Sequence, residues 1–256
     1  MTKELAKTNS SAIAVLASKE SAATLQSMFD AGVVLYQLPK IKVPPGGITA
    51  FTVEGGLNGE ENLKEIECVI SATRPSMRSW YRQNDGPLGT APDCSSIDGR
   101  TGIGNNVDTG SPDGEGVHQC IACPWSKLGS DRKGGKGSDC KEFSEVYCFV
   151  GSNRMPNLLK IPRSSKKAFT TYMMTLVNAG HTIQSVVTKL QLKKTQNKAG
   201  QTYSEIAFAF VRPLDQAELA AAATVSQVIS SAIASAIVAA AGRHVLVDGN
   251  DDGEID

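Results

Sequence analysis

The chain has 256 residues, of which 41% are hydrophobic and 5% aromatic, so it can bury a sizeable core but has few aromatic rings. It carries 26 basic and 26 acidic residues, and these totals by themselves argue against a nucleic-acid ligand. The charge is unevenly placed, however, because five acids and no base fall within residues 248–256. Without this tail the chain has 26 basic against 21 acidic residues. A basic body with an acidic tail is informative about binding partners rather than about the fold.

The compartment is predicted from two stretches of sequence. The first twenty residues carry scattered charges and no apolar run of the kind found in a secretory signal. The most hydrophobic long stretch, 219–241, is mostly alanine interrupted by hydroxyl side chains, which make a poor membrane span. We therefore expect a cytoplasmic protein without a membrane partner, whose six cysteines are metal ligands or buried thiols rather than disulfides.

The first part of the chain predicts a helical segment followed by short strands. Residues 1–33 have apolar side chains at helical spacing and end near a glycine. Apolar runs bounded by proline and glycine then predict strands at 33–38, 41–43, 48–53 and 65–73. Residues 84–139 differ, because they hold 12 of the 24 glycines and show no periodicity. A loop of this length needs something other than a hydrophobic core to order it.

Regular elements are expected again after Cys140. The pattern predicts strands at 143–150, 158–162, 182–192 and 202–211, a helix capped by Ser165, an Ala-rich helix at 214–241 and an extended piece at 244–247. The sequence thus predicts a mainly β fold with flanking helices, in the α+β class. The predicted organisation is a helical segment at 1–33, a binding domain at 34–213 with an insertion at about 84–141, an Ala-rich helix at 214–243 and an acidic tail at 244–256.

Four cysteines predict a zinc ion inside the glycine-rich loop. Cys120 and Cys123 form a Cys-x-x-Cys pair, and Cys94 and Cys140 lie 26 residues before and 17 residues after it. Four thiolates complete the closed tetrahedron of a structural zinc site, and ligation stabilises a loop that has no core. A redox pair, an iron–sulfur cluster, or His118 in place of Cys94 remain alternatives. The other two cysteines, Cys68 and Cys148, lie in apolar strands and are interpreted as small buried hydrophobes.

Basic residues interleaved with aromatic rings indicate a single-stranded nucleic acid as ligand, because phosphates pair with cations and bases stack on rings. Ten basic residues against four acids lie between Trp125 and Lys167, and further lysines lie on the last predicted hairpin. The alternatives are that Trp80 is core, that Trp125 packs over the metal site and that the lysines form an ordinary solvated surface. The predicted interface comprises Arg74, Arg78, Trp80, Tyr81, Arg82, Trp125, Lys127, Arg132, Lys133, Lys136, Lys141, Lys189 and Lys193.

Several short motifs together resemble the single-stranded DNA-binding proteins of tailed bacteriophages that carry a zinc-binding insertion in an oligonucleotide-binding (OB) fold. The motifs are Leu38-Pro39-x-Ile41, Cys120-x-x-Cys123 leading through Trp125 and Gly129 to Lys136-Gly137-x-x-Cys140-Lys141, Leu159-x-Ile161-Pro162-x-Ser164, Phe169-x-x-Tyr172, Val186-Val187-Thr188-Lys189 and the strand at Tyr203.

The resemblance has implications for fold, function and partners. It implies an OB-like five-stranded barrel that coats single strands without catalysis in replication, recombination or repair. It also implies a tail that contacts partner proteins or competes for the DNA groove. The tail acids are Asp248, Asp251, Asp252, Glu254 and Asp256, and the tail departs from bacterial tails in lacking a terminal aromatic residue.

Other classes of function receive less support from the residues. Only three histidines are present, and no Ser–His–Asp arrangement or complete phosphate-binding loop is found, so we do not expect an enzyme. A zinc-stabilised module that binds another protein, such as a host-takeover factor, is the alternative, since a fold of this kind serves many functions. Small residues in the Ala-rich helix also allow self-association as a homo-oligomer.

Overall fold

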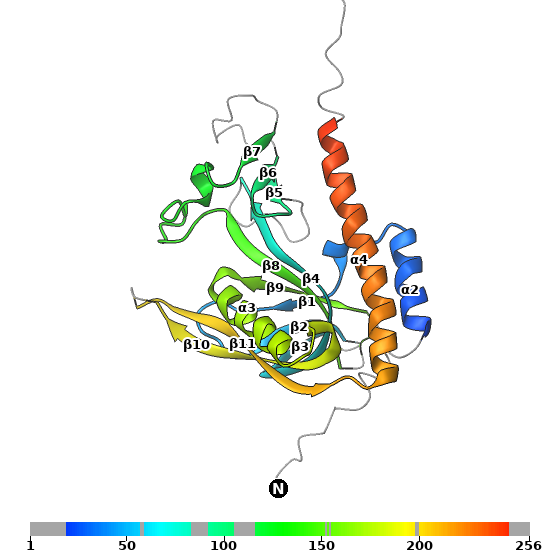
Figure 1. Cartoon of the computed structure of the whole chain (residues 1–256). Coiled ribbons are helices and arrows are strands. Elements are labelled where there is room, and N and C mark those ends of the chain that lie inside the picture. The colour runs from blue at the N-terminus through cyan, green and yellow to red at the C-terminus, as the bar shows by residue number, and fades with distance from the viewer. Residues whose placement is uncertain are drawn as a thin grey trace, which may run out of the picture. The chain divides into compact units, whose positions relative to one another are not determined.

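The structure is a computed structural model and describes residues 19–56, 59–82, 92–104, 116–151, 153, 155–197 and 200–245 (Figure 1). Residues 246–256 of the predicted acidic tail and the chain before Lys19 lie outside these residues. The chain divides into two compact units. Unit 1 takes the chain up to Thr73 together with Glu145–Ser230, and unit 2 takes Arg74–Ser144 together with the chain from Ser231.

Unit 1 is built on an open sheet. The strands follow one another in the order β3-β2-β1-β9-β8-β4-β10-β11. Strands β1 and β9 pair in parallel, and β4, β10 and β11 form antiparallel neighbours. The bounds are β1 Lys40–Lys42, β2 Phe51–Gly56, β3 Gly59–Leu63, β4 Glu65–Trp80, β8 Lys141–Val150, β9 Asn157–Pro162, β10 Val186–Gln196 and β11 Thr202–Pro213, with β4 and β8 continuing into unit 2.

The core of unit 1 lies between this sheet and helix α3, Arg163–Asn178. The helix contributes Phe169, Tyr172 and Leu176, whose spacing places them on one face. Phe208 of β11 packs against the rings of Phe169 and Tyr172, with centroids 5.2 Å and 5.8 Å away. Period-2 alternation in β10 directs Leu190 and Leu192 into this core and leaves Gln191 and Lys193 exposed, whereas β8 is buried on both sides over Phe143–Val150.

Two further helices lie before the first strand and after the last strand of the chain. Helix α2, Lys19–Asp30, is followed by Gly32 at φ 92°, a left-handed conformation that suits glycine. Helix α4, Gln216–Val245, buries Ala222, Val225 and Ile229 along one side. By length and composition alone, Gln216–Ala236 could cross a membrane, which is weak support for a span because core helices pass the same test.

Unit 2 contains the glycine-rich segment. Its short strands form an antiparallel meander that continues from β4. The strands are β5 Cys94–Ser96, β6 Thr101–Ile103 and β7 Val117–Gln119, followed by the 3₁₀ helix η3 Pro124–Ser126 and the start of β8. Three-residue strands are too short to produce a readable alternation, which explains why the sequence predicted only a loop here.

The structure confirms a mainly β, α+β fold and corrects several predicted details. The predicted strand at 33–38 is wrong, because Leu35–Gln37 forms a 3₁₀ helix, η1. Ser165 does not cap α3, which begins after Pro162; instead its buried hydroxyl accepts the Ile206 N–H at 2.9 Å. His244 lies inside α4 rather than in an extended piece. No described pairing joins the edge strands of unit 1, so the sheet is open where a closed barrel was expected.

Candidate metal centre

Four cysteines from separate segments of unit 2 line one small cavity. Cys94 begins β5, Cys120 follows β7, Cys123 precedes η3 and Cys140 precedes β8. Each is at most 8% exposed, and the cavity measures about 10 Å³. That volume suits one water-sized sphere, and therefore a single ion. The structure thus brings together the four cysteines that the spacing singled out.

Polar side chains surround the thiols. Cys94 Sγ lies 3.2 Å from His118 Nε2, while the Ser96 hydroxyl and the Arg78 guanidinium line the cavity and hold down the pKa of Cys120 and Cys140, respectively, against the effect of burial. Gly102 makes room for the imidazole, because a Cβ there would stand 2.6 Å from His118 Nε2. Hydrogen bonds of this kind orient metal ligands and tune their charge.

Burial controls the protonation of these groups. It raises the pKa of Cys94 to about 12, with repulsion from the other thiols adding to the effect. Burial also raises the pKa of Cys140 to about 12, although Arg78 opposes the shift, and it lowers the pKa of His118. Anionic sulfurs in such a cavity need a cation beside them, because burial disfavours an uncompensated charge.

The donor set fits a soft or borderline tetrahedral metal ion, although the ligands are not yet arranged around one. Among the described residues, no group of three or more His, Cys, Asp or Glu side chains could hold a metal ion as it stands. Ligation would therefore require a different arrangement of the thiols. Four sulfurs, with one imidazole as a spare donor, match the ligand types that zinc prefers in structural sites.

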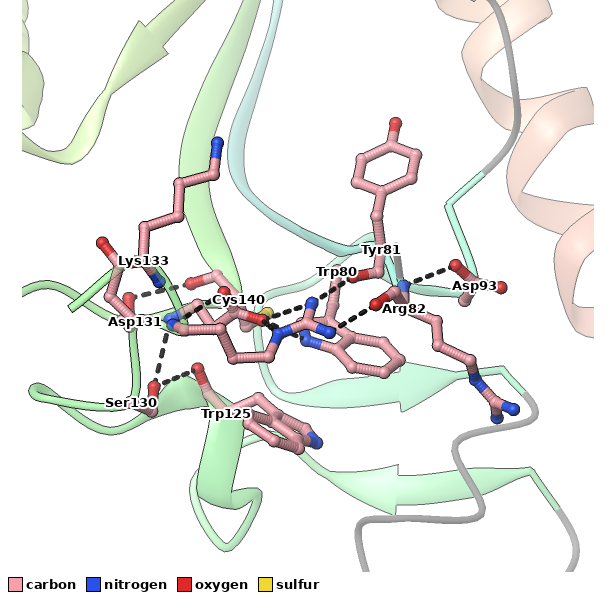
Figure 2. Close-up of polar contacts among 12 residues, drawn as sticks. Trp80, Tyr81, Arg82, Asp93, Trp125, Ser130, Asp131, Lys133 and Cys140 are labelled. Atoms are coloured by element: carbon pink, nitrogen blue, oxygen red, sulfur yellow. Dashed lines mark hydrogen bonds and ion pairs between the residues drawn. The ribbon is translucent and has the colours of Figure 1, made fainter. Parts of the chain in front are cut away.

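A stacked tryptophan pair braces the segment beside the cavity. The rings of Trp80 and Trp125 are 5.6 Å apart and inclined by 22°. The guanidinium of Arg132 lies over both rings, 5.0 Å from the first centroid and 5.4 Å from the second. Asp139 accepts hydrogen bonds from Trp80 Nε1 at 2.6 Å and from Arg132 Nε at 2.7 Å. Arg132 also donates to the carbonyl oxygens of Tyr81 and Arg82 (Figure 2).

This brace engages several residues that were predicted for the nucleic-acid interface. Trp80 is only 2% exposed, which is the burial that the core alternative describes and which leaves little of the ring open to a base. Arg132 is occupied by Asp139 and two carbonyl groups, and Trp125 stacks on Trp80. Arg78 lines the cavity and pairs with Glu142 at 3.4 Å. These side chains hold the segment together rather than face a ligand.

Other predicted residues remain at the surface of unit 2. Four of its lysines are exposed, namely Lys127, Lys133, Lys136 and Lys141. Tyr81 points away from the tryptophan pair in Figure 2, and partial burial with the nearby charge of Asp93 raises its pKa. Arg74 is half-buried, and the Arg82 backbone N–H donates to Asp93 at 2.7 Å. The exposed lysines and Tyr81 are what remains of the predicted interface in this unit.

The two predicted residues of unit 1 lie on β10. Lys189 pairs with Glu65 at 3.9 Å, and Lys193 is exposed opposite Glu205 in the neighbouring strand. In the core, the Cys68 thiol hydrogen-bonds with Cys148, and this bond together with burial raises the pKa of Cys68. Both thiols belong to the hydrophobic cluster, as the sequence predicted.

Sequence reasoning missed the polar residues that support the cavity. Asp139, which joins the tryptophan pair to Arg132, was counted only as an acid among basic neighbours. Its position directly before a predicted ligand was the one available signal. Ser96 gave no signal, because a serine in a glycine-rich loop is ordinary.

Comparison with protein families, with curated proteins and with solved structures finds no match. The resemblance to phage single-stranded DNA-binding proteins therefore stays a prediction.

Proposed function

We propose that this chain is a non-catalytic single-stranded DNA-binding protein whose insertion is held by a structural zinc ion. The convergence of four buried thiols on one small cavity carries the metal part of the proposal. A site with four protein ligands leaves no open position for a substrate, which is why we assign it a structural role.

The need for such an ion follows from the composition of unit 2. Among the residues that the structure describes, the hydrophobic cluster beside the cavity consists of Trp80, Cys94 and Cys140, with Trp125 packed against it. So small a cluster offsets little of the conformational entropy lost on folding. Ligation by Cys94, Cys120, Cys123 and Cys140 would supply the missing stabilisation.

The nucleic-acid part of the proposal is supported by charge. Lys127, Lys133, Lys136 and Lys141 are exposed on the segment that the cavity holds. Cations on a fixed scaffold attract a polyanion, and displaced counterions make such binding salt-dependent. An OB-like arrangement of unit 1 belongs to this proposal, supported by the Ser204 hydroxyl, which bridges from β11 to the carbonyl oxygens of Pro44 and Ile48 after β1.

We further propose replication, recombination or repair in the cytoplasm of a bacterial host as the setting, with the acidic tail contacting partner proteins.

Two measurements test the proposal. Elemental analysis of the purified chain is expected to find one zinc per chain. Fluorescence anisotropy with a labelled single-stranded oligonucleotide, beside the same sequence as duplex, is expected to show single-strand binding that weakens steeply with salt. Absence of single-strand binding at low salt, with residues 248–256 removed, would overturn the DNA part.

One observation favours a second function, that of a zinc-braced module binding another protein. Ile121 and Leu128 are 89% and 71% exposed on the segment around the cysteines, and exposed apolar side chains mark contact surfaces. Replacing both by serine would leave salt-dependent DNA binding unchanged under the first proposal. Absence of nucleic-acid binding by the unaltered chain, together with a protein partner that is lost when both residues are replaced, would favour the second.

A further inference from the structure

A second candidate site lies wholly within unit 1, and none of the residues predicted for the nucleic-acid interface lines it. It is a groove of about 470 Å³ between β1 with its Val43–Pro45 continuation, β9, the first turn of α3 and the start of β11. We call it the β1–β9 groove. Its lining residues are Lys40, Ile41, Lys42, Val43, Pro44, Pro45, Leu158, Lys160, Pro162, Ser164, Tyr203 and Ser204.

The alternation of two paired strands creates the chemistry of this groove. Strands β1 and β9 pair in parallel, with Lys40 opposite Leu158. Lys160 is exposed, whereas its neighbours Leu159 and Ile161 are buried in the core. The groove therefore has an apolar floor with ammonium groups at its rim.

The walls of the groove are already fixed. The Ser204 hydroxyl bonds to Pro44 O at 2.9 Å and to Ile48 O at 2.8 Å, which ties the loop after β1 to β11. Gly47 in this loop has φ 78°, and a Cβ there would collide with Thr202, so the loop lies tightly against the hairpin. A groove with rigid walls needs little reorganisation on binding.

The charge of the groove selects an anion. None of the described residues that line it is acidic, while three are lysines. The Lys42 ammonium forms ion pairs with Glu54 and Glu60, each at 2.7 Å, so its charge is already used within the wall of the groove. Lys40 and Lys160 line the groove as well, and Lys160 is exposed at the surface.

We propose that the β1–β9 groove binds single-stranded nucleic acid, with Tyr203 stacking on a base and Lys40 and Lys160 on phosphates. This inference rests on the proposed DNA-binding function and gives that function a site. A positive rim, an apolar floor and a ring are the three features that bind single strands without reading their sequence. A proline-rich or acidic peptide has neither regularly spaced phosphates nor stacking bases, so it would not use the positive rim and the ring together.

The test uses matched variants of the full chain in anisotropy titrations with a labelled oligothymidylate at two salt concentrations. Tyr203→Leu keeps an apolar side chain on the strand but removes the ring, and it is expected to weaken binding roughly tenfold or more. Tyr203→Phe keeps the ring and is expected to bind like the wild type. The double variant Lys40→Gln/Lys160→Gln is expected to lower the slope of log K against log salt by about 1.4.

Lys64→Gln is the control, because Lys64 is an exposed lysine of unit 1 outside the groove. The groove assignment is overturned if the wild type binds the oligonucleotide and the Tyr203→Leu and double-lysine variants bind equally well, an outcome that leaves the proposed function intact. No binding by the wild type, with or without the tail, overturns both. Photo-crosslinking of a halogenated oligonucleotide to the peptide that contains Tyr203 would support the assignment independently of affinity.

Discussion

At the scale of single residues, Arg78 has a role that its charge alone did not indicate. Its Nε donates to Gly99 O at 3.0 Å, and its guanidinium also contacts Glu142 and the Cys140 thiol. It therefore ties β4 to the β5–β6 turn while placing a positive charge beside the cavity. Four thiolates around a divalent ion carry excess negative charge, which a neighbouring guanidinium offsets.

Arg78→Gln is expected to weaken zinc binding by about 10- to 100-fold without unfolding unit 1, because it removes this supporting charge. Competition with a chromophoric chelator measures the change. Arg74→Gln is the control, since Arg74 lies on the same strand but does not line the cavity. Equal zinc affinities for the two variants would show that Arg78 acts only as part of the surface.

The sequence predicted site residues best where a residue type has few alternative roles, as the cysteines do. Thiols at metal-ligand spacing identified the lining of the cavity, since few other arrangements explain four cysteines in a loop. Arginine and tryptophan are less specific, because both serve binding surfaces and internal contacts. Burial of Trp80 and the Arg132–Asp139 ion pair depend on tertiary packing, which the sequence does not show.

At the scale of elements, the start of α4 is held by a reciprocal cap. Asp215 Oδ1 accepts the Glu218 N–H at 2.9 Å, and Glu218 Oε2 accepts the Asp215 N–H at 2.8 Å. Glu218 also receives two hydrogen bonds from Arg212, at 2.8 Å and 2.9 Å. The hydrogen bond from Arg212 lowers the pKa of Glu218, against a smaller opposing effect of burial.

Asp215→Ala is expected to destabilise the protein by about 0.5–2 kcal/mol, because it removes the N-cap. Glu218 adds a pH dependence: its pKa is depressed in the folded state, so its contribution is present above the ordinary value of 4.5 and is lost as the pH falls through the lowered pKa. Urea unfolding at pH 7 and pH 4 measures both effects. Gln227→Ala, on the exposed side of α4, should leave stability nearly unchanged.

The metal-holding segment is a second element whose stability is predictable. Cys120→Ser/Cys123→Ser is expected to reduce the zinc content from one to near zero per chain. Hydrogen exchange in 116–141 should then accelerate by ~100-fold or more, while the β10–β11 hairpin keeps its protection. Cys68→Ala is the control, since it alters a buried thiol of the core without touching the cavity. Unchanged exchange in 116–141 would refute the structural role of the metal.

Elements with strong periodicity were predictable from sequence, and irregular ones were not. The apolar spacing in α3 and the alternation in β11 gave these elements close to their observed positions. The 3₁₀ helix at Leu35–Gln37 was mistaken for a strand, because a short apolar run before proline has no distinct helical period. Sheet closure depends on which edges pair, and that is a long-range property.

At the scale of the whole molecule, charge is the property that joins the proposals. Removing 248–256 leaves an excess of basic residues, because the tail holds five acids. We expect this deletion to tighten binding to a single-stranded oligonucleotide several-fold at low salt, and less at high salt where charges are screened. Anisotropy titration of both chains measures it. A full-length variant with the five acids neutralised to amides should match the deletion if charge, rather than tail length, is responsible.

The stacked pair of Trp80 and Trp125 also gives the protein a spectroscopic property. These are the only two tryptophans in the chain, and both lie beside the thiol cavity. All tryptophan emission therefore originates from one place in unit 2, while Tyr203 in the β1–β9 groove contributes none. Excitation at the red edge of the absorption band would follow metal loading and release through this emission, in real time and without an attached dye.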